Sequence, residues 1–283
     1  MESVTLTHLV ELLLLFSGGK NAVRLVVQNA EYEGLRLLAK EAGLTVCPCT
    51  KKFAPVHSST LGDRFFTTVD WDDPSGDTFA VYLSILPTFA QRGAKAESTQ
   101  QNDATLGTLL QIPSCCMEAY ARLKKGESWL RLWVEDTANF DFGFRLSNHI
   151  SSYISGCSLH GDYLPCALHC RPTLQKARKS SETLMDFGLD SLLDHALIWG
   201  ASPVLILADQ LIFLRGQEPL EQGRRFRVRQ DSLRTHGPSV CVSSETLDNI
   251  REIEILPELV RVIGEISYNI DLRTVFHKFL NFR

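Results

Sequence analysis

The stretch that decides the fold is residues 22–47, AVRLVVQNAEYEGLRLLAKEAGLTVC. Its first part, Ala22–Val27, is rich in Val and Leu, which favours a β-strand. Apolar residues then recur at helical spacing over Glu31–Ala42, and Gly43 is a typical residue just beyond the C-terminal end of a helix. Because Leu44–Val46 begins a second strand-like run, the stretch predicts a β-α-β unit.

Two further strands are expected in the N-terminal part, at Arg64–Val69 and Thr78–Leu86, with the turn residues Asp72–Gly76 between them. Together with the β-α-β unit they predict an α/β module over residues 1–95. The following stretch, Gln91–Asp103, is polar and small and has no apolar period, so we expect a loop or linker there.

The rest of the chain changes character twice. Residues 103–200 read as helical and hold five of the eight cysteines, whereas residues 201–283 read as β-rich. The helices expected in the central region are the leucine-rich run from Leu106, Ser114–Leu123, Trp129–Thr137 and Leu174–Phe187. The C-terminal segment is expected to contain a hairpin of Pro203–Leu207 and Leu211–Leu214, strands at Phe226–Val228 and Val240–Val242, and a helix at Leu256–Glu265. The predicted class is mixed α+β, in three segments or one compact domain.

Composition excludes several classes of protein. With 283 residues, 44% hydrophobic and 22% charged, the chain reads as globular rather than disordered, and its net charge of −4 predicts no general attraction to nucleic acid or an anionic membrane. The apolar stretch Thr5–Phe16 contains His8 and Glu11, is shorter than the roughly 20 residues that span a bilayer, and has no basic residue before it. We therefore expect a buried helix there and a cytoplasmic protein, where clustered cysteines indicate metal binding or catalysis rather than disulfides.

Two short motifs concentrate the cysteines. Pro113–Cys116 (PSCC) precedes a helical run, and Pro165–Cys170 (PCALHC) precedes another. Proline is favoured at the start of a helix, so each motif predicts cysteines in a first helical turn, where free N–H groups and the helix dipole favour the thiolate. The four-residue spacing of the second motif would place its two sulfurs on one helical face. The predicted metal ligands are Cys115, Cys116, Cys166 and Cys170.

Four thiolates suit an iron–sulfur cluster or zinc. The leading hypothesis is an iron–sulfur protein with redox or sulfur-transfer chemistry on a small-molecule substrate. The alternatives are a structural zinc protein without catalysis, a metal-free thiol-redox enzyme, and an interaction protein whose cysteines only pack in the core.

Residues close to the second motif are candidates for contacting a bound group. His160, His169 and Arg171 are the predicted cofactor-binding residues, and His160-Gly161-Asp162 also resembles the His-x-Asp part of a facial-triad iron site. Cys157 is a further possible ligand.

The remaining cysteines and one basic run have weaker claims. Cys47 and Cys49 form a second pair whose side chains would point the same way in a strand, and Cys241 is expected in the core. The alternating run Arg224–Arg229 resembles a basic edge strand, which more often guards against aggregation than binds RNA, so no nucleic-acid partner is expected.

The order of these motifs carries a resemblance. A leucine-rich helix, then P-x-C-C opening another helix, then P-C-x-x-x-C about fifty residues later resembles an archaeal and bacterial family known mainly as a domain of unknown function. The resemblance covers Leu106–Lys179. In that family a histidine shortly before the second Pro-Cys is expected, and here the nearest is His160, five residues before Pro165. The resemblance implies that the four cysteines act as a unit and brings no reaction with it.

Overall fold

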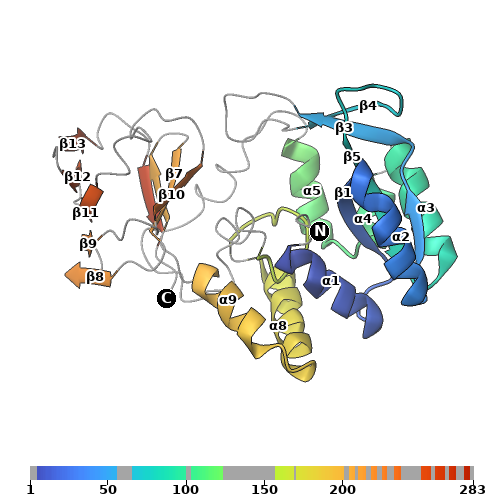
Figure 1. The fold of residues 1–283 in the computed structure, drawn as a ribbon. Coiled ribbons are helices and arrows are strands. Elements are labelled where there is room, and N and C mark those ends of the chain that lie inside the picture. Colours follow the sequence, from blue (N-terminus) through green and yellow to red (C-terminus); the bar gives the residue numbers. More distant parts are fainter. Residues whose placement is uncertain are drawn as a thin grey trace. The chain divides into compact units, whose positions relative to one another are not determined.

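The computed structural model describes residues 5–55, 66–99, 103–123, 157–168 and 170–200, together with the strands between residues 204 and 280. The chain divides into two compact units (Figure 1). The first contains residues 1–58, 64–127 and 153–196, and the second contains residues 59–63, 128–152 and 197–283. Helices and antiparallel sheets give the mixed α+β class that the sequence predicts.

The first unit holds the helices and one sheet. Its helices are α1 (Leu6–Phe16), the short 3-10 helix η1 (Asn29–Glu31), α2 (Tyr32–Glu41), α3 (Pro87–Ser98), α4 (Asp103–Leu109), α5 (Ser114–Leu123), α8 (Arg171–Asp186) and the start of α9 (Asp190–Gly200). Its strands are β1 (Val23–Gln28), β2 (Thr45–Pro48), β3 (Lys51–Pro55), β4 (Phe66–Asp70) and β5 (Thr78–Ser84).

The predicted β-α-β unit is present, but another strand is inserted into it. Both β1 and β2 pair antiparallel with β5, so they run parallel to each other with β5 between them. Beyond β2, β3 also pairs with β5, through Phe53 and Thr78. On its other side, β3 pairs with β4. The turn predicted at Asp72–Gly76 joins β4 to β5, and the Asp73 carboxylate accepts the Ser75 backbone N–H at 2.9 Å.

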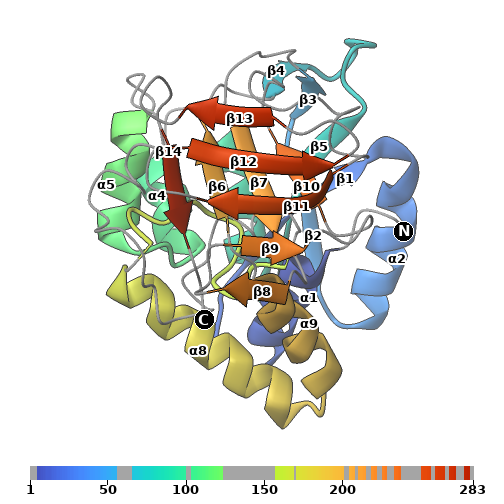
Figure 2. The same cartoon turned by 90° about the vertical axis from the view of Figure 1, so that its left-hand side faces the viewer.

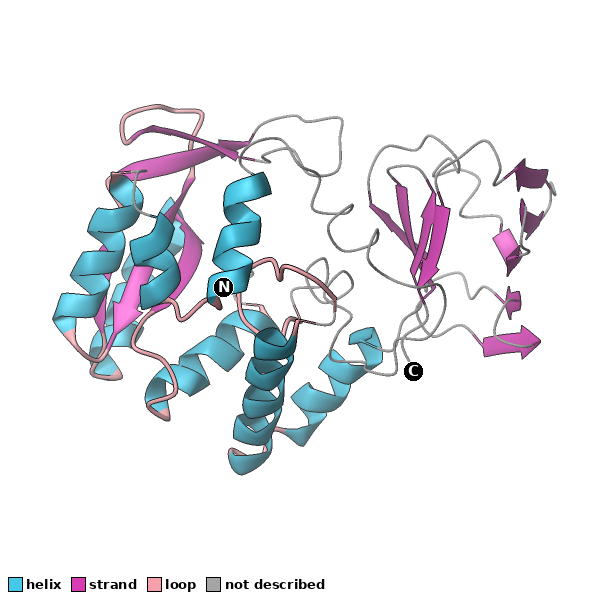
Figure 3. Ribbon diagram, turned by 180° about the vertical axis from the view of Figure 1, so that it is seen from behind, coloured by secondary structure: helices cyan, strands magenta, loops and turns pink. Residues whose placement is uncertain are grey.

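Helices cover both faces of the sheet (Figure 3). The side chains of β5 alternate between the two faces and are buried on both. One face packs against α1 and α2, and the other packs against α3 and α4. The buried residues of the first face are Leu15, Val23, Leu25, Val27, Ala39, Leu44, Phe79, Val81 and Leu83. Those of the second face are Ala22, Cys49, Ala80, Tyr82, Ala90, Ala94 and Leu109.

The loop predicted at Gln91–Asp103 is wrong, because most of that stretch belongs to α3. Ala90 and Ala94 are small residues that pack on the sheet, and they give the helix a buried face without large apolar side chains. The backbone approaches so closely that a Cβ at Gly93 would lie 2.2 Å from Cδ1 of Tyr82. Small residues therefore allow this helix to pack against the sheet, although its polar composition predicts a loop.

The helix expected at Thr5–Phe16 is confirmed as α1. Thr5 caps its N-terminus, because the Thr5 side chain accepts the backbone N–H of His8. Within the part of the chain that the structure describes, no helix combines the length and apolar character needed to cross a bilayer.

The second unit contains two antiparallel sheets, with strand orders β10-β7-β6-β14 and β13-β12-β11-β9-β8. Figure 2 faces the larger sheet. The strands are β6 (Val204–Leu207), β7 (Gln210–Leu214), β8 (Glu218–Glu221), β9 (Arg225–Arg227), β10 (Leu233–His236), β11 (Ile250–Ile255), β12 (Leu259–Gly264), β13 (Tyr268–Asp271) and β14 (His277–Leu280).

The hairpin of β6 and β7 and the strand near Phe226 are confirmed. That strand, β9, pairs with both β8 and β11, so the basic edge strand predicted there is wrong. The helix predicted at Leu256–Glu265 is wrong, since Leu259–Gly264 is β12 and pairs with β11. Its Val and Ile residues fit a pleated strand better than a helix. The elements predicted at Trp129–Thr137 and Val240–Val242 lie outside the described residues.

Candidate metal centre

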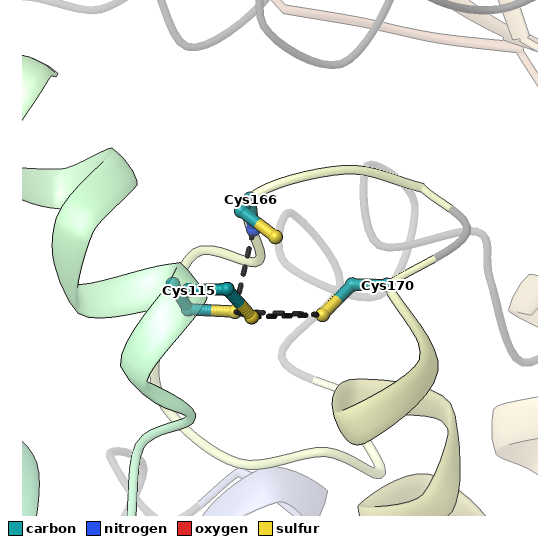
Figure 4. A group of neighbouring side chains, drawn as sticks. Cys115, Cys166 and Cys170 are labelled. Carbon is teal, nitrogen blue, oxygen red and sulfur yellow. Dashed lines mark hydrogen bonds between the residues drawn. The ribbon is translucent and has the colours of Figure 1, made fainter.

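Three segments of the first unit bring four cysteine sulfurs together (Figure 4). Cys115 and Cys116 lie in the first turn of α5, as the first motif predicts. Cys166 lies in the loop of residues 157–168, and Cys170 occupies the N-cap position of α8. The four predicted ligands are thus side by side.

The second motif does not form the helix that was predicted from Pro165. Cys166 lies in the loop, and α8 begins only at Arg171. The physical reason is Pro172, which is tolerated in the first turn of α8. In a helix that began at Pro165 the same proline would lie in the interior, where its ring clashes with the carbonyl four residues earlier. The two sulfurs meet because the loop folds back, not because they share a helical face.

The sulfur atoms form a compact group. Sγ of Cys170 lies 3.7 Å from Sγ of Cys115 and 3.7 Å from Sγ of Cys116, and the last two are 3.9 Å apart. All four sulfurs lie within 4.8 Å of one another. In the described part of the chain, this is the one group of three or more His, Cys, Asp or Glu side chains that is placed to hold a metal ion.

Among the described residues, donors other than the cysteine thiols reach two of the four sulfurs. The Thr173 hydroxyl donates to Sγ of Cys170 at 3.2 Å and lies 3.5 Å from Sγ of Cys116. The backbone N–H of Cys166 donates to Sγ of Cys116 at 3.4 Å. The Tyr163 hydroxyl in turn donates to Oγ1 of Thr173 at 3.1 Å. A chain of hydroxyl groups therefore supports the cluster from within α8 and the loop.

The pKa values of three of the four thiols are shifted, and not in the same direction. A hydrogen bond from the Cys116 thiol, together with those from Thr173, lowers the pKa of Cys170 to about 4. The pKa of Cys116 is raised, first because its proton is engaged by Cys170 and then because it is buried. Burial and the neighbouring thiols raise the pKa of Cys166 to about 12. A negative charge therefore settles first on Cys170, and a bound cation would favour the thiolate form of all four.

Two of the three predicted cofactor-binding residues, His160 and Arg171, lie outside the four-sulfur group. His160 is buried, and its ring nitrogens lie near the Ser158 hydroxyl and the Tyr163 carbonyl, at 2.7 and 3.1 Å. Burial lowers its pKa to about 3, so the ring is neutral at pH 7. Arg171 is exposed at the first position of α8. His169 lies outside the described residues.

The facial-triad reading of His160-Gly161-Asp162 has no support in this geometry. Asp162 is not part of the four-sulfur group: its backbone N–H donates to the Glu11 carboxylate at 3.4 Å, and its carboxylate lies 3.6 Å from Arg24. The backbone N–H of Ser158 donates to the Thr7 hydroxyl at 2.7 Å. These contacts tie the loop that carries Cys166 to α1 and β1.

The loop contacts a buried ion pair. Lys20 and Glu11 are both buried and form a salt bridge, so each compensates the other's charge. Gly161 passes directly over this pair with a φ of +109°, and a Cβ there would lie 2.7 Å from Oε1 of Glu11. Glycine is the residue that accepts both this conformation and the close approach.

The remaining cysteines lie apart from the four. Cys49 is buried in the core between the sheet and α3, and Cys47 packs against the same core. Both side chains contact this core, where the Cys49 thiol donates to the Ala94 carbonyl at 3.7 Å and to the Glu97 carboxylate at 3.9 Å. Cys157 is buried and is not a member of the four-sulfur group. Cys241 lies outside the described residues.

Sequence reasoning missed the side chains that surround the cluster. Thr173 follows Cys170 by three residues, a spacing that was available as a signal because it brings two side chains together at the start of a helix. The Lys176 ammonium lies 4.8 Å from the centre of the Tyr163 ring and donates to the Gln111 carbonyl at 3.0 Å. Burial lowers the pKa of Lys176 to about 8. No pattern in the sequence connects Tyr163, Lys176 and Gln111.

No protein-family model, no curated protein and no solved structure matches this chain. Its geometry defines the class: an α+β protein with a four-cysteine cluster that can hold a metal ion.

Proposed function

We propose that Cys115, Cys116, Cys166 and Cys170 bind a single zinc ion. The sulfur spacing supports this most directly. A regular tetrahedron with Zn–S bonds of about 2.3 Å separates its sulfurs by about 3.8 Å. The three distances among Cys115, Cys116 and Cys170 are 3.7, 3.7 and 3.9 Å. Three of the four sulfurs are therefore spaced as ligands of one tetrahedral ion, and Sγ of Cys166 lies within 4.8 Å of them.

The alternative is an iron–sulfur cluster, which is the leading hypothesis from the sequence. In a [4Fe–4S] cluster each thiolate binds its own iron, and in a [2Fe–2S] cluster two thiolates bind each of the two irons, so thiolates on different irons are held further apart than thiolates that share one ion. The redox or sulfur-transfer chemistry and the small-molecule substrate belong to that reading. They stay predictions, as do the cytoplasmic location and the family resemblance of Leu106–Lys179.

The role that the ligand set favours is structural. Four protein thiolates complete the coordination of zinc, whereas catalytic zinc sites keep one position open for water or substrate. The ion would join the start of α5, the loop of residues 157–168 and the start of α8. It would close the chain between Cys116 and Cys166, a stretch of fifty residues, and so restrict the unfolded state.

Anaerobic purification followed by elemental analysis and a visible spectrum tests the proposal. We expect one zinc per chain and a colourless protein. Cys170→Ala should lose the zinc, whereas the matched control Cys49→Ala, at a buried cysteine outside the cluster, should keep it. A brown protein with several irons per chain would favour the cluster, and a chain that folds and retains reversible thiol oxidation without any metal would favour the thiol enzyme.

A further inference from the structure

The four sulfurs of the proposed zinc site differ in the hydrogen bonds that they receive. Thr173 donates to Cys170 at 3.2 Å and lies 3.5 Å from Sγ of Cys116, which also accepts the backbone N–H of Cys166 at 3.4 Å. For Cys115 and Cys166, the described residues place only other sulfurs within hydrogen-bonding reach of Sγ. Among the described residues, Cys116 and Cys170 therefore receive hydrogen bonds from outside the cluster, whereas Cys115 and Cys166 do not.

Tyr163 fixes the direction of the Thr173 hydroxyl. A threonine hydroxyl has one proton to donate, and it accepts through its oxygen. Because Tyr163 donates to that oxygen at 3.1 Å, the Thr173 proton is directed to a sulfur. Thr173 is fully buried, with 0% of its surface exposed, so water does not compete for this hydrogen bond.

Burial divides the cysteines in the same way. Cys116 and Cys170 are buried, with exposed fractions of 1% and 5%. Cys115 and Cys166 are half-buried, so solutes can approach them. Two independent properties, the supply of hydrogen bonds and the access of solvent, therefore single out the same two sulfurs.

We propose, building on the zinc site above, that Cys115 and Cys166 are sites of covalent modification by soft carbon electrophiles, while Cys116 and Cys170 are protected. A metal-bound thiolate attacks through its sulfur lone pair, and donors that engage this lone pair make it a weaker nucleophile. In the step, a sulfur–carbon bond forms and the bond from carbon to the leaving group breaks. The leaving group departs with the electron pair, and the thiolate becomes a neutral thioether, which is a poorer zinc ligand. Thr173 is a positioning residue, and Tyr163 acts through it.

Limited alkylation of the zinc-loaded full-length protein by iodoacetamide, mapped by fragment mass spectrometry, tests this proposal. We expect Cys115 and Cys166 to be labelled at least about 10-fold faster than Cys116 and Cys170, the size of effect expected for one hydrogen bond to a charged group. Thr173→Val, which keeps the side-chain volume and removes the donor, should speed the labelling of Cys170 and Cys116. Thr173→Ser should restore the protection.

Equal labelling of the four cysteines, or a Thr173→Val pattern identical to that of the wild type, would overturn the inference. If Thr173→Val does not fold, Tyr163→Phe gives the same test more gently, because it leaves the ring beneath Lys176 and removes only the hydroxyl. Zinc analysis of the same samples distinguishes a failure of the proposed function from a failure of this inference. A zinc-free protein overturns the proposed function and the inference together, whereas one zinc with the wrong labelling order overturns only the inference.

Discussion

Replacing Cys116 by alanine removes the most buried ligand of the proposed zinc site. Its side chain is 1% exposed, and its sulfur lies within 3.9 Å of the sulfurs of Cys115 and Cys170. Without this ligand, α5 keeps only Cys115 as its link to the ion. We expect the zinc to be lost or bound much more weakly, and the protein to become less stable.

Two contributions add up to the expected loss in the free energy of unfolding. The ion closes fifty residues between Cys116 and Cys166, and opening a loop of that length costs about 4 kcal/mol by the chain-entropy relation. Removing a buried sulfur costs about 1 kcal/mol more, comparable to a methylene group. The free energy of unfolding should therefore fall by about 5 kcal/mol in Cys116→Ala.

Urea unfolding of zinc-loaded protein measures this difference, with Cys49→Ala as the matched control. Cys49 is as deeply buried but lies in the core beside α3, so its replacement should cost about 1 kcal/mol and release no zinc. Adding a chelator to the wild type should reproduce most of the Cys116→Ala loss. If Cys116→Ala keeps its zinc, or if the two variants lose the same stability, the cross-linking role of the cluster is refuted.

Three further predictions concern the first unit. Gly93→Ala should destabilise the protein by about 1–3 kcal/mol in urea because its Cβ would overlap a tyrosine ring, whereas Gly34→Ala on the open face of α2 should be neutral or stabilising; equal effects would contradict the close packing of α3. Lys20→Met should cost about 3–5 kcal/mol because it leaves the buried Glu11 carboxylate without its partner, and a loss below about 1 kcal/mol would show that the pair is not buried in solution. The pKa of His160 falls from an ordinary 6.5 to about 3 on folding, so the unfolded chain binds more protons than the folded one below about pH 6.5. The free energy of unfolding of the wild type should therefore fall by up to about 1.4 kcal/mol per pH unit relative to that of His160→Gln as the pH drops below 6.5. Identical pH profiles in urea would argue against a buried neutral ring.

The sequence was sufficient where local pattern decides structure. The strand and helix of residues 22–47, the capped helix at Thr5 and the cysteine-bearing turn of α5 each follow from spacing, caps and prolines that lie close together in the chain. The two proline-led pairs of a metal-binding residue type also singled out the four cysteines that the structure brings together.

The failures arise where contacts distant in sequence decide. The helix α3 is buried through Ala90, Gly93 and Ala94, whose fit against Tyr82 is visible only once the sheet exists. The start of α8 depends on Pro172, which lies beyond the motif and excludes a helix through Pro165. The surroundings of His160 have the same kind of origin: the loop docks on α1, and the His160 ring contacts Ser158 and Tyr163 of its own loop.

X-ray absorption at the zinc edge, on protein purified without added metal, tests the central claim most directly. A site formed by Cys115, Cys116, Cys166 and Cys170 gives one shell of four sulfurs at about 2.3 Å and no neighbouring metal atom. The absence of zinc, a shell with nitrogen or oxygen in place of some of the sulfurs, or an iron edge with metal–metal scattering would contradict it.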